Sequence, residues 1–262
     1  MADYQAYDKF SFDYDKFVNW ESRLGFELPF IEAQIERLGS DVRVLDAACG
    51  TGMHAIALAQ RGIKVAGADL SDGMVKKART NAALANQEVR FEQGGFGELS
   101  KVFGEESFEV VLCLGNSLPH ILSEPELAHA LSDFADCLQP GGLLIIQNRN
   151  FDAVMALKER WMEPQSYREE DREWLFLRFY DYIADGTIDF NIVTLRREQH
   201  GGWQQVLTRT RLRPLLQADL ESALEKAGFE AIQTYGDLSG TAFDRSNSGN
   251  LVVTARRKRR QA

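Results

Sequence analysis

Between residues 41 and 148, short continuous apolar runs alternate with longer segments in which apolar residues recur every three to four positions. The short runs are typical of strands buried on both faces, and the spaced segments are typical of amphipathic helices. Their regular alternation predicts an α/β fold, a doubly wound and mostly parallel sheet with helices on both faces. The predicted strands are 42–46, 64–68, 89–92, 108–114 and 143–147, and the predicted helices are 53–61, 72–85 and 124–138.

The pattern changes after residue 149. Apolar and polar residues then alternate in three segments joined by the turn dipeptides Asp185-Gly186 and Gly201-Gly202, which predicts a small antiparallel sheet acting as a lid or an oligomer contact. A last helix and two strands return to the first sheet and complete a Rossmann-like fold of seven strands. The predicted antiparallel strands are 174–182, 187–197 and 204–213, a helix precedes them at 151–158, and the returning elements are 218–227, 231–235 and 251–255.

The first forty residues are rich in aromatic side chains from Tyr4 to Trp20, and Phe26 to Leu38 has helical apolar spacing. This segment either packs on the edge of the sheet or covers the mouth of a site. The predicted units are an N-terminal arm at 1–40, a core at 41–150, an inserted lid at 151–216, and a completion of the core with a basic tail at 217–262.

A glycine-containing turn, Asp46-Ala47-Ala48-Cys49-Gly50-Thr51-Gly52, follows the first predicted strand. Glycine lets a backbone approach a ligand closely, and the free N–H groups that open the next helix favour an anion. The second predicted strand ends in Asp69, placed to accept both hydrogen bonds of a ribose diol. The spacing from Gly50 to Ala55 also fits a dinucleotide site, and a glycine-rich turn occurs in ordinary α/β domains. The pattern therefore predicts a nucleoside-containing cofactor without settling which one.

Composition narrows the classes of function. Hydrophobic residues are 44% and charged residues 26%, typical of a soluble globular protein, and a net charge of −9 argues against general nucleic-acid binding. The basic run Arg256–Arg260 is the exception, either a contact for RNA or a membrane surface or a solvated end. No apolar run approaches the ~20 residues of a membrane span. Three cysteines without metal spacing predict reduced thiols, no metal site and a cytoplasmic protein.

Polar residues at the ends of the fourth and fifth predicted strands are the candidates for acceptor chemistry. Asn116 offers a donor and an acceptor, and His120 is placed to orient substrate or cofactor or, equally, to cap a helix. Arg149 leaves a buried strand, which is costly unless an anion awaits it. Asp152, three residues later, is the structural alternative for that anion.

These segments resemble known methyltransferases. The turn from Asp46 to Gly52 resembles motif I of class I S-adenosylmethionine (SAM) methyltransferases, and with Cys113-Leu114-Gly115-Asn116-Ser117, His120 and Arg149-Asn150-Phe151-Asp152 it resembles the glycine N-methyltransferase family, including glycine/sarcosine methyltransferases. The resemblance implies that Arg149 holds an amino-acid carboxylate, Asn116 orients the amine and Tyr14 closes the site. The resemblance and the positions of the strand ends together predict which residues surround SAM or its product S-adenosylhomocysteine. These residues are Arg23, Asp46, Ala48, Gly50, Gly52, His54, Asp69, Leu70, Met74, Gly95, Phe96, Leu114 and Gly115.

One segment departs from the family. Arg211-Leu212-Arg213-Pro214 stands where the family has consecutive tyrosines before a proline, and the alternating arginines there predict either a solvated face or an anion-binding rim. The sequence thus predicts a SAM-dependent methyltransferase for the nitrogen of a small amine that bears a carboxylate. The alternatives are methylation of a larger metabolite on oxygen or nitrogen, a nucleic-acid methyltransferase that uses the basic tail, and a non-catalytic SAM-binding protein; a homo-oligomer is open in each case.

Overall fold

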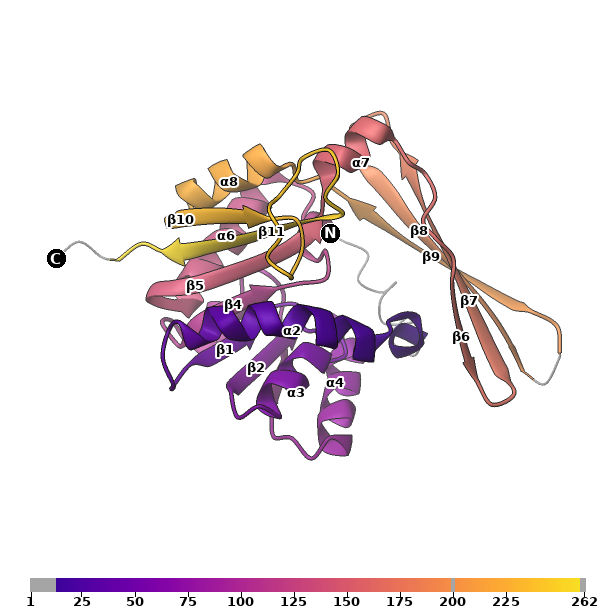
Figure 1. Cartoon of the computed structure of the whole chain (residues 1–262), viewed down its shortest axis with the longest axis horizontal. Helices are drawn as coiled ribbons and strands as arrows, with labels where there is room; N and C mark the ends of the chain where they lie inside the picture. The colour runs from indigo at the N-terminus through magenta and orange to yellow at the C-terminus, as the bar shows by residue number, and fades with distance from the viewer. Residues whose placement is uncertain (1–12, 199–200, 260–262) are drawn as a thin grey trace.

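The computed structural model describes residues 13–198 and 201–259, and it contains two sheets (Figure 1). The first has seven strands and the second has four, and the chain leaves the first sheet once and returns to it once. The first comprises β1 (Arg43–Asp46), β2 (Lys64–Asp69), β3 (Arg90–Gln93), β4 (Phe108–Cys113), β5 (Leu138–Arg149), β10 (Phe229–Tyr235) and β11 (Asn250–Arg257). The second comprises β6 (Gln165–Glu169), β7 (Arg172–Tyr182), β8 (Ile188–Glu198) and β9 (Gln204–Leu212).

The seven-stranded sheet has the order β10-β11-β5-β4-β1-β2-β3, in which β11 runs antiparallel to its neighbours and the strands from β5 to β3 are parallel. Helices cover both of its faces. Their apolar sides supply the buried clusters that hold the layers together, since β-branched and leucine side chains of the central strands face both ways. The helices are α2 (Trp20–Glu36), α3 (Met53–Ala59), α4 (Asp72–Leu84), α5 (Leu99–Phe103), α6 (Glu124–Cys137), α7 (Phe151–Leu157) and α8 (Gln217–Lys226), with a short 3₁₀ turn at Leu118–His120.

The predicted α/β fold is confirmed, and several boundaries differ. Helix α2 begins at Trp20 rather than Phe26, because Asn19 caps it by accepting from the Ser22 N–H at 3.1 Å. The predicted loop Pro140–Gly142 lies inside β5, where the register with β4 shifts. Strand β6 was not predicted at all.

The second sheet is an antiparallel meander that extends beside the carboxyl ends of the parallel strands (Figure 1). Its order is β6-β7-β8-β9, and one of its faces carries buried aromatic and β-branched residues while the other is more exposed. The predicted turn at Asp185-Gly186 is present, with Gly186 at φ +86°. The buried face is the one turned toward the first sheet and the space between them.

Residues 13–19 connect the two sheets. The Asp15 carboxylate accepts hydrogen bonds from Thr51 Oγ1 at 2.6 Å and Asn81 Nδ2 at 3.2 Å, both on the first sheet's side. On the other side, Trp174 Nε1 of β7 donates to Asp13 at 3.0 Å. This described part of the N-terminal arm therefore spans the gap, while the aromatic residues of positions 1–12 lie outside the described residues.

Candidate active site

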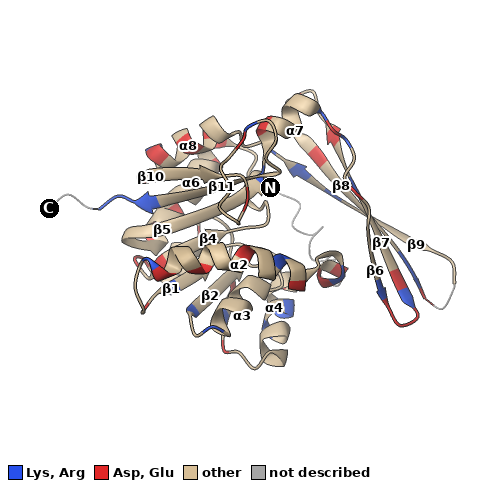
Figure 2. Cartoon of the chain, viewed as in Figure 1, with Lys and Arg blue, Asp and Glu red and all other residues tan. Residues whose placement is uncertain are grey.

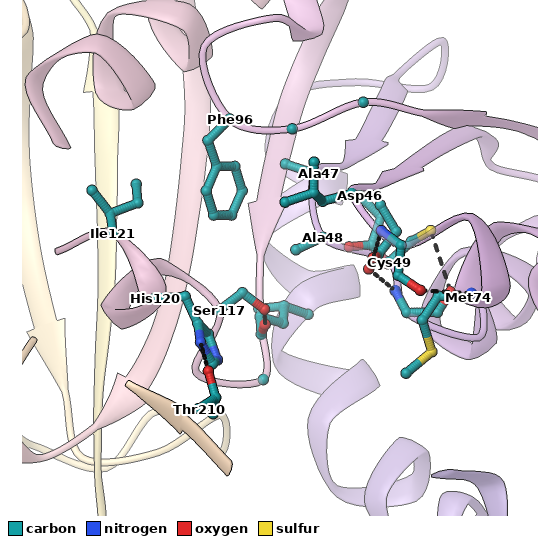
Figure 3. Close-up of a pocket in the computed structure, with 18 of the residues that line it drawn as sticks. Asp46, Ala47, Ala48, Cys49, Met74, Phe96, Ser117, His120, Ile121 and Thr210 are labelled. Carbon is teal, nitrogen blue, oxygen red and sulfur yellow. Dashed lines mark hydrogen bonds between the residues drawn. The ribbon is translucent and has the colours of Figure 1, made fainter. Parts of the chain in front are cut away.

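A cavity of about 560 Å³ lies beyond the carboxyl ends of the parallel strands, between the first sheet, the arm and the buried face of the second sheet (Figure 3). This is the place at which open α/β sheets bind ligands. The structure brings most of the predicted site residues together there. Those that line the cavity are Arg23, Asp46, Ala48, Gly50, His54, Asp69, Leu70, Met74, Gly95, Phe96, Leu114, Gly115 and His120, with Tyr14.

Three predicted residues, Gly52, Asn116 and Arg149, are not among the described residues that line the cavity. Gly52 has a packing role: its φ is +81°, and a Cβ there would lie 2.7 Å from the Phe91 ring. The predicted need for glycine at this position therefore has a steric cause inside the core. A contact between Gly52 and the cofactor stays a prediction.

Asp46, at the end of β1, is a buried carboxylate on the cavity wall (Figure 3). Neither of its oxygens accepts a well-aligned hydrogen bond from a described residue. Burial raises its pKa to about 6, and the nearby Asp69 charge adds to that effect, whereas His54 opposes it. Because a buried negative charge without a pairing side chain is costly, a cation bound beside Asp46 would stabilise its ionised form.

Asp69 joins the end of β2 to the glycine turn. Its carboxylate accepts from the backbone N–H groups of Gly50 and Ser71, each at 2.9 Å. The hydrogen bonds fix the turn against the strand, with Gly50 at φ +53°. Asp69 is half-buried and lines the cavity, so a role toward a ribose diol stays a prediction that the geometry allows.

Glu27 on α2, which the sequence did not single out, anchors two predicted residues. Its carboxylate lies 3.0 Å from Arg23 Nε and 2.6 Å from His54 Nε2, and it accepts a hydrogen bond from Gln147 Nε2 at 3.4 Å. Burial favours the neutral acid, but the His54 hydrogen bond and the Arg23 charge outweigh it and lower the pKa of Glu27. A glutamate four residues after an arginine on a helix looks like a surface pair in sequence, which hid this role.

The opposite wall of the cavity combines the predicted Phe96 and His120 with residues from the second sheet. His120 Nδ1 lies 3.1 Å from Thr210 Oγ1 of β9, as the dashed line in Figure 3 marks. Burial lowers the pKa of His120 to about 4, so its ring is neutral at pH 7. Phe190 and Ile192 of β8 complete the wall. In the sequence, their spacing of two residues shows that they lie on the same face of a strand. The sequence does not show that this face turns toward the cavity.

Asn116 ties the ends of β4 and β5 together. Its Oδ1 accepts from the backbone N–H of Arg149 at 2.9 Å, and its own N–H donates to the Gln147 carbonyl at 3.0 Å, with φ at +66°. Asp152, the alternative anion predicted for Arg149, has other partners. It pairs with Arg245 at 2.5 Å and accepts a hydrogen bond from the Gln217 N–H.

Other basic residues have structural partners. Arg211 pairs with Asp189 at 2.5 Å and Arg213 with Glu124 at 3.2 Å, which does not favour the predicted anion-binding rim. Arg256 and Arg257 belong to β11, so the basic run begins inside the sheet rather than in a solvated tail. Figure 2 shows acidic and basic residues interspersed over the helices and strands of both sheets.

Within residues 13–198 and 201–259, no helix has the length and apolar character that crossing a bilayer requires. The same residues contain no cluster of three or more histidine, cysteine or acidic side chains placed to hold a metal ion. All three cysteines are free and buried, and burial raises the pKa of each thiol.

Comparisons with known proteins agree with this geometry. Residues 44–142 match the family model described as a methyltransferase domain. The chain is 30% identical to a glycine/sarcosine N-methyltransferase from Aphanothece halophytica, over 87% of this chain and 81% of the relative. It is 28% identical to the enzyme of the same name from Halorhodospira halochloris, over 90% and 83%. Among solved structures, the CcbJ methyltransferase from Streptomyces caelestis superposes with a TM-score of 0.77 at 26% identity, over 97% of this chain and 98% of that one.

Proposed function

The chain belongs to the glycine/sarcosine N-methyltransferase family of SAM-dependent enzymes, and we propose that it methylates the amine nitrogen of a small amino acid, with glycine and sarcosine as first candidates. The observation that carries the proposal is a cavity whose wall contains the buried carboxylate of Asp46, neither oxygen of which accepts a well-aligned hydrogen bond from a described residue. A cytoplasmic location is part of the proposal and rests on the sequence alone.

The residues on the cofactor side suit SAM, which carries a carboxylate, an ammonium group and a sulfonium. Arg23 offers a guanidinium toward the carboxylate, and Asp46 offers a buried carboxylate that no described side chain pairs with. Gly50 leaves room for a close approach, and Phe96 offers an apolar ring, itself packed edge-on against Phe134 at 5.4 Å. Bound SAM supplies a methyl group already activated for displacement.

The residues of this chain then have positioning work to do. A neutral amine attacks without an enzymatic base, so alignment and exclusion of water account for most of the catalysis. Arg149 would hold the acceptor carboxylate, and Asn116, whose carbonyl oxygen has a second lone pair beyond the one used by Arg149, would orient the amine. His120 is neutral and borders the same space.

The test is methyl transfer from labelled SAM to glycine, sarcosine and methylamine. Methylation of the two amino acids without methylamine supports the carboxylate site. Arg149→Ala is expected to raise the KM for the amino acid more than tenfold while leaving the KM for SAM unchanged, since a lost charge-assisted contact costs roughly 1.5–3 kcal/mol. Arg209→Ala, at an exposed position of β9, is the matched control. Equal losses toward both substrates would contradict the assignment of Arg149.

A further inference from the structure

The buried face of β7 carries an arginine where its neighbours are aromatic. Phe176, Arg178 and Tyr180 alternate along the strand and so share one face, on which Phe176 and Tyr180 are almost fully buried. Arg178 is in register with Ile192, which lines the cavity. Its guanidinium lies over the ring of Phe17, another lining residue, at 5.1 Å. Arg178 is therefore an inward-facing cation at the border of the acceptor space.

Arg149 approaches the same place from the first sheet. Burial lowers the pKa of Arg178 and the positive charge of Arg149 lowers it further, while both guanidinium groups oppose the rise that burial causes in the pKa of Tyr180. Two cations from different sheets thus lie within electrostatic range of one phenol. Arg149 is exposed and Arg178 is half-buried, so water screens part of their mutual repulsion, and an anion bound between them would offset the rest.

No described acidic group offsets it. Neither Arg149 nor Arg178 forms an ion pair with a described carboxylate, and the Nε of Arg178 is buried without an acceptor among the described residues. Several other arginines of the second sheet and its flanks form ion pairs, whereas the exposed Arg209 of β9 forms none with a described residue. The paired examples are Arg160 with Asp181, Arg168 and Arg197 with Glu173, Arg172 with Glu169, and Arg211 with Asp189.

We propose that Arg149 and Arg178 together form a site for a dianion, so that the preferred acceptor is an amino acid with two carboxylates rather than glycine. This inference rests on the proposed function, because it names the substrate class of that same site. A guanidinium fork binds one carboxylate in a bidentate manner, and two forks on different elements suit two carboxylates of one small molecule. A single carboxylate would leave one of the two positive charges uncompensated.

The test uses malonate and acetate as probes of the anion site in the enzyme saturated with S-adenosylhomocysteine, measured by titration calorimetry. The wild type is expected to bind malonate at least about tenfold more tightly than acetate, the size of one added close charge contact. Arg178→Gln is expected to bring the ratio close to one with unchanged affinity for S-adenosylhomocysteine. Arg178→Met is the second variant, because its unbranched chain keeps the contact with Phe17 without the charge. Arg209→Gln is the control and should leave the ratio unchanged.

Two results would overturn the dianion site: equal affinities of the wild type for malonate and acetate, or a malonate preference that survives in both Arg178 variants. Methyl transfer to aspartate and glycine, measured on the same samples, separates this inference from the proposed function. Methylation of glycine without a malonate preference overturns the dianion site and leaves the proposed function standing. A malonate preference that depends on Arg178 in an enzyme that methylates no amino acid supports the anion site and contradicts the proposed function.

Discussion

Replacing Asp46 with asparagine is expected to stabilise the protein without cofactor and to weaken its binding of SAM. Folding raises the pKa of Asp46 from 3.8 to about 6, so the folded protein favours the neutral acid. The associated stability is present below about pH 4 and is lost as the pH rises through about 6. At pH 8 the ionised carboxylate therefore lowers the free energy of unfolding by about 3 kcal/mol. An asparagine resembles the neutral acid in shape and avoids that loss.

Binding of the cofactor should show the opposite preference. A cation bound beside Asp46 favours the ionised form, which makes up roughly a tenth of the free protein at pH 5 and nearly all of it at pH 8. The affinity of the wild type for SAM is thus expected to rise about tenfold over that interval, corresponding to one unit of pKa. Asp46→Asn should bind SAM more weakly at pH 8 and lose this pH dependence.

The assay is urea-induced unfolding of the cofactor-free protein at pH 5 and pH 8, with calorimetric titration of SAM at both values. Asp219→Asn, at an exposed position of α8, is the control for loss of one acidic charge. The reasoning is refuted if Asp46→Asn has a lower free energy of unfolding than the wild type at pH 8, or if both proteins bind SAM equally well.

Three further changes follow from the geometry. Gly52→Ala should lower the free energy of unfolding by about 1–3 kcal/mol in urea titrations, since φ is +81° and the Cβ meets a ring; no change would contradict the steric argument. Glu27→Gln removes the charge that Arg23 and His54 share, and thermal unfolding should show a loss of about 3 kcal/mol or more with weaker SAM binding; an unchanged melting temperature would count against the network. Because burial lowers the pKa of His120 to about 4, the wild type should lose up to about 3 kcal/mol relative to His120→Gln as the pH falls from 7 to 4, and parallel stability curves would contradict its burial.

The parts of the fold that depend on local pattern were predictable from the sequence. Strands that are buried on both faces appear in the sequence as continuous apolar runs. Asp46 and Asp69 could be predicted as site residues because each is the first polar residue after such a run. The glycine turn and its neighbours were predicted for the same reason: close backbone approach and helix starts have local sequence signals.

The rest depends on contacts between distant segments. Glu27 looks solvated on an amphipathic helix, and only packing of α2 over the glycine turn buries it against His54. Strand β6 is polar and half-exposed, so it pairs with β7 without an apolar alternation that would reveal it. Arg178 likewise looks like one more surface charge in a strand, because the sequence does not tell which face of a sheet turns inward.

The chain leaves the first sheet once, forms the whole second sheet and then returns, and this has a consequence for how the acceptor specificity of such a fold can change. Residues of the strand-end loops from β1 to β4 and residues of the separate meander from β6 to β9 meet in one cavity but are encoded in stretches that do not overlap. A substitution in the meander can reshape the wall that receives the acceptor without altering the loops around Asp46. The fold is in this sense modular: exchange of one contiguous stretch, with its two crossing points kept, is a route to a new acceptor on an unchanged cofactor scaffold.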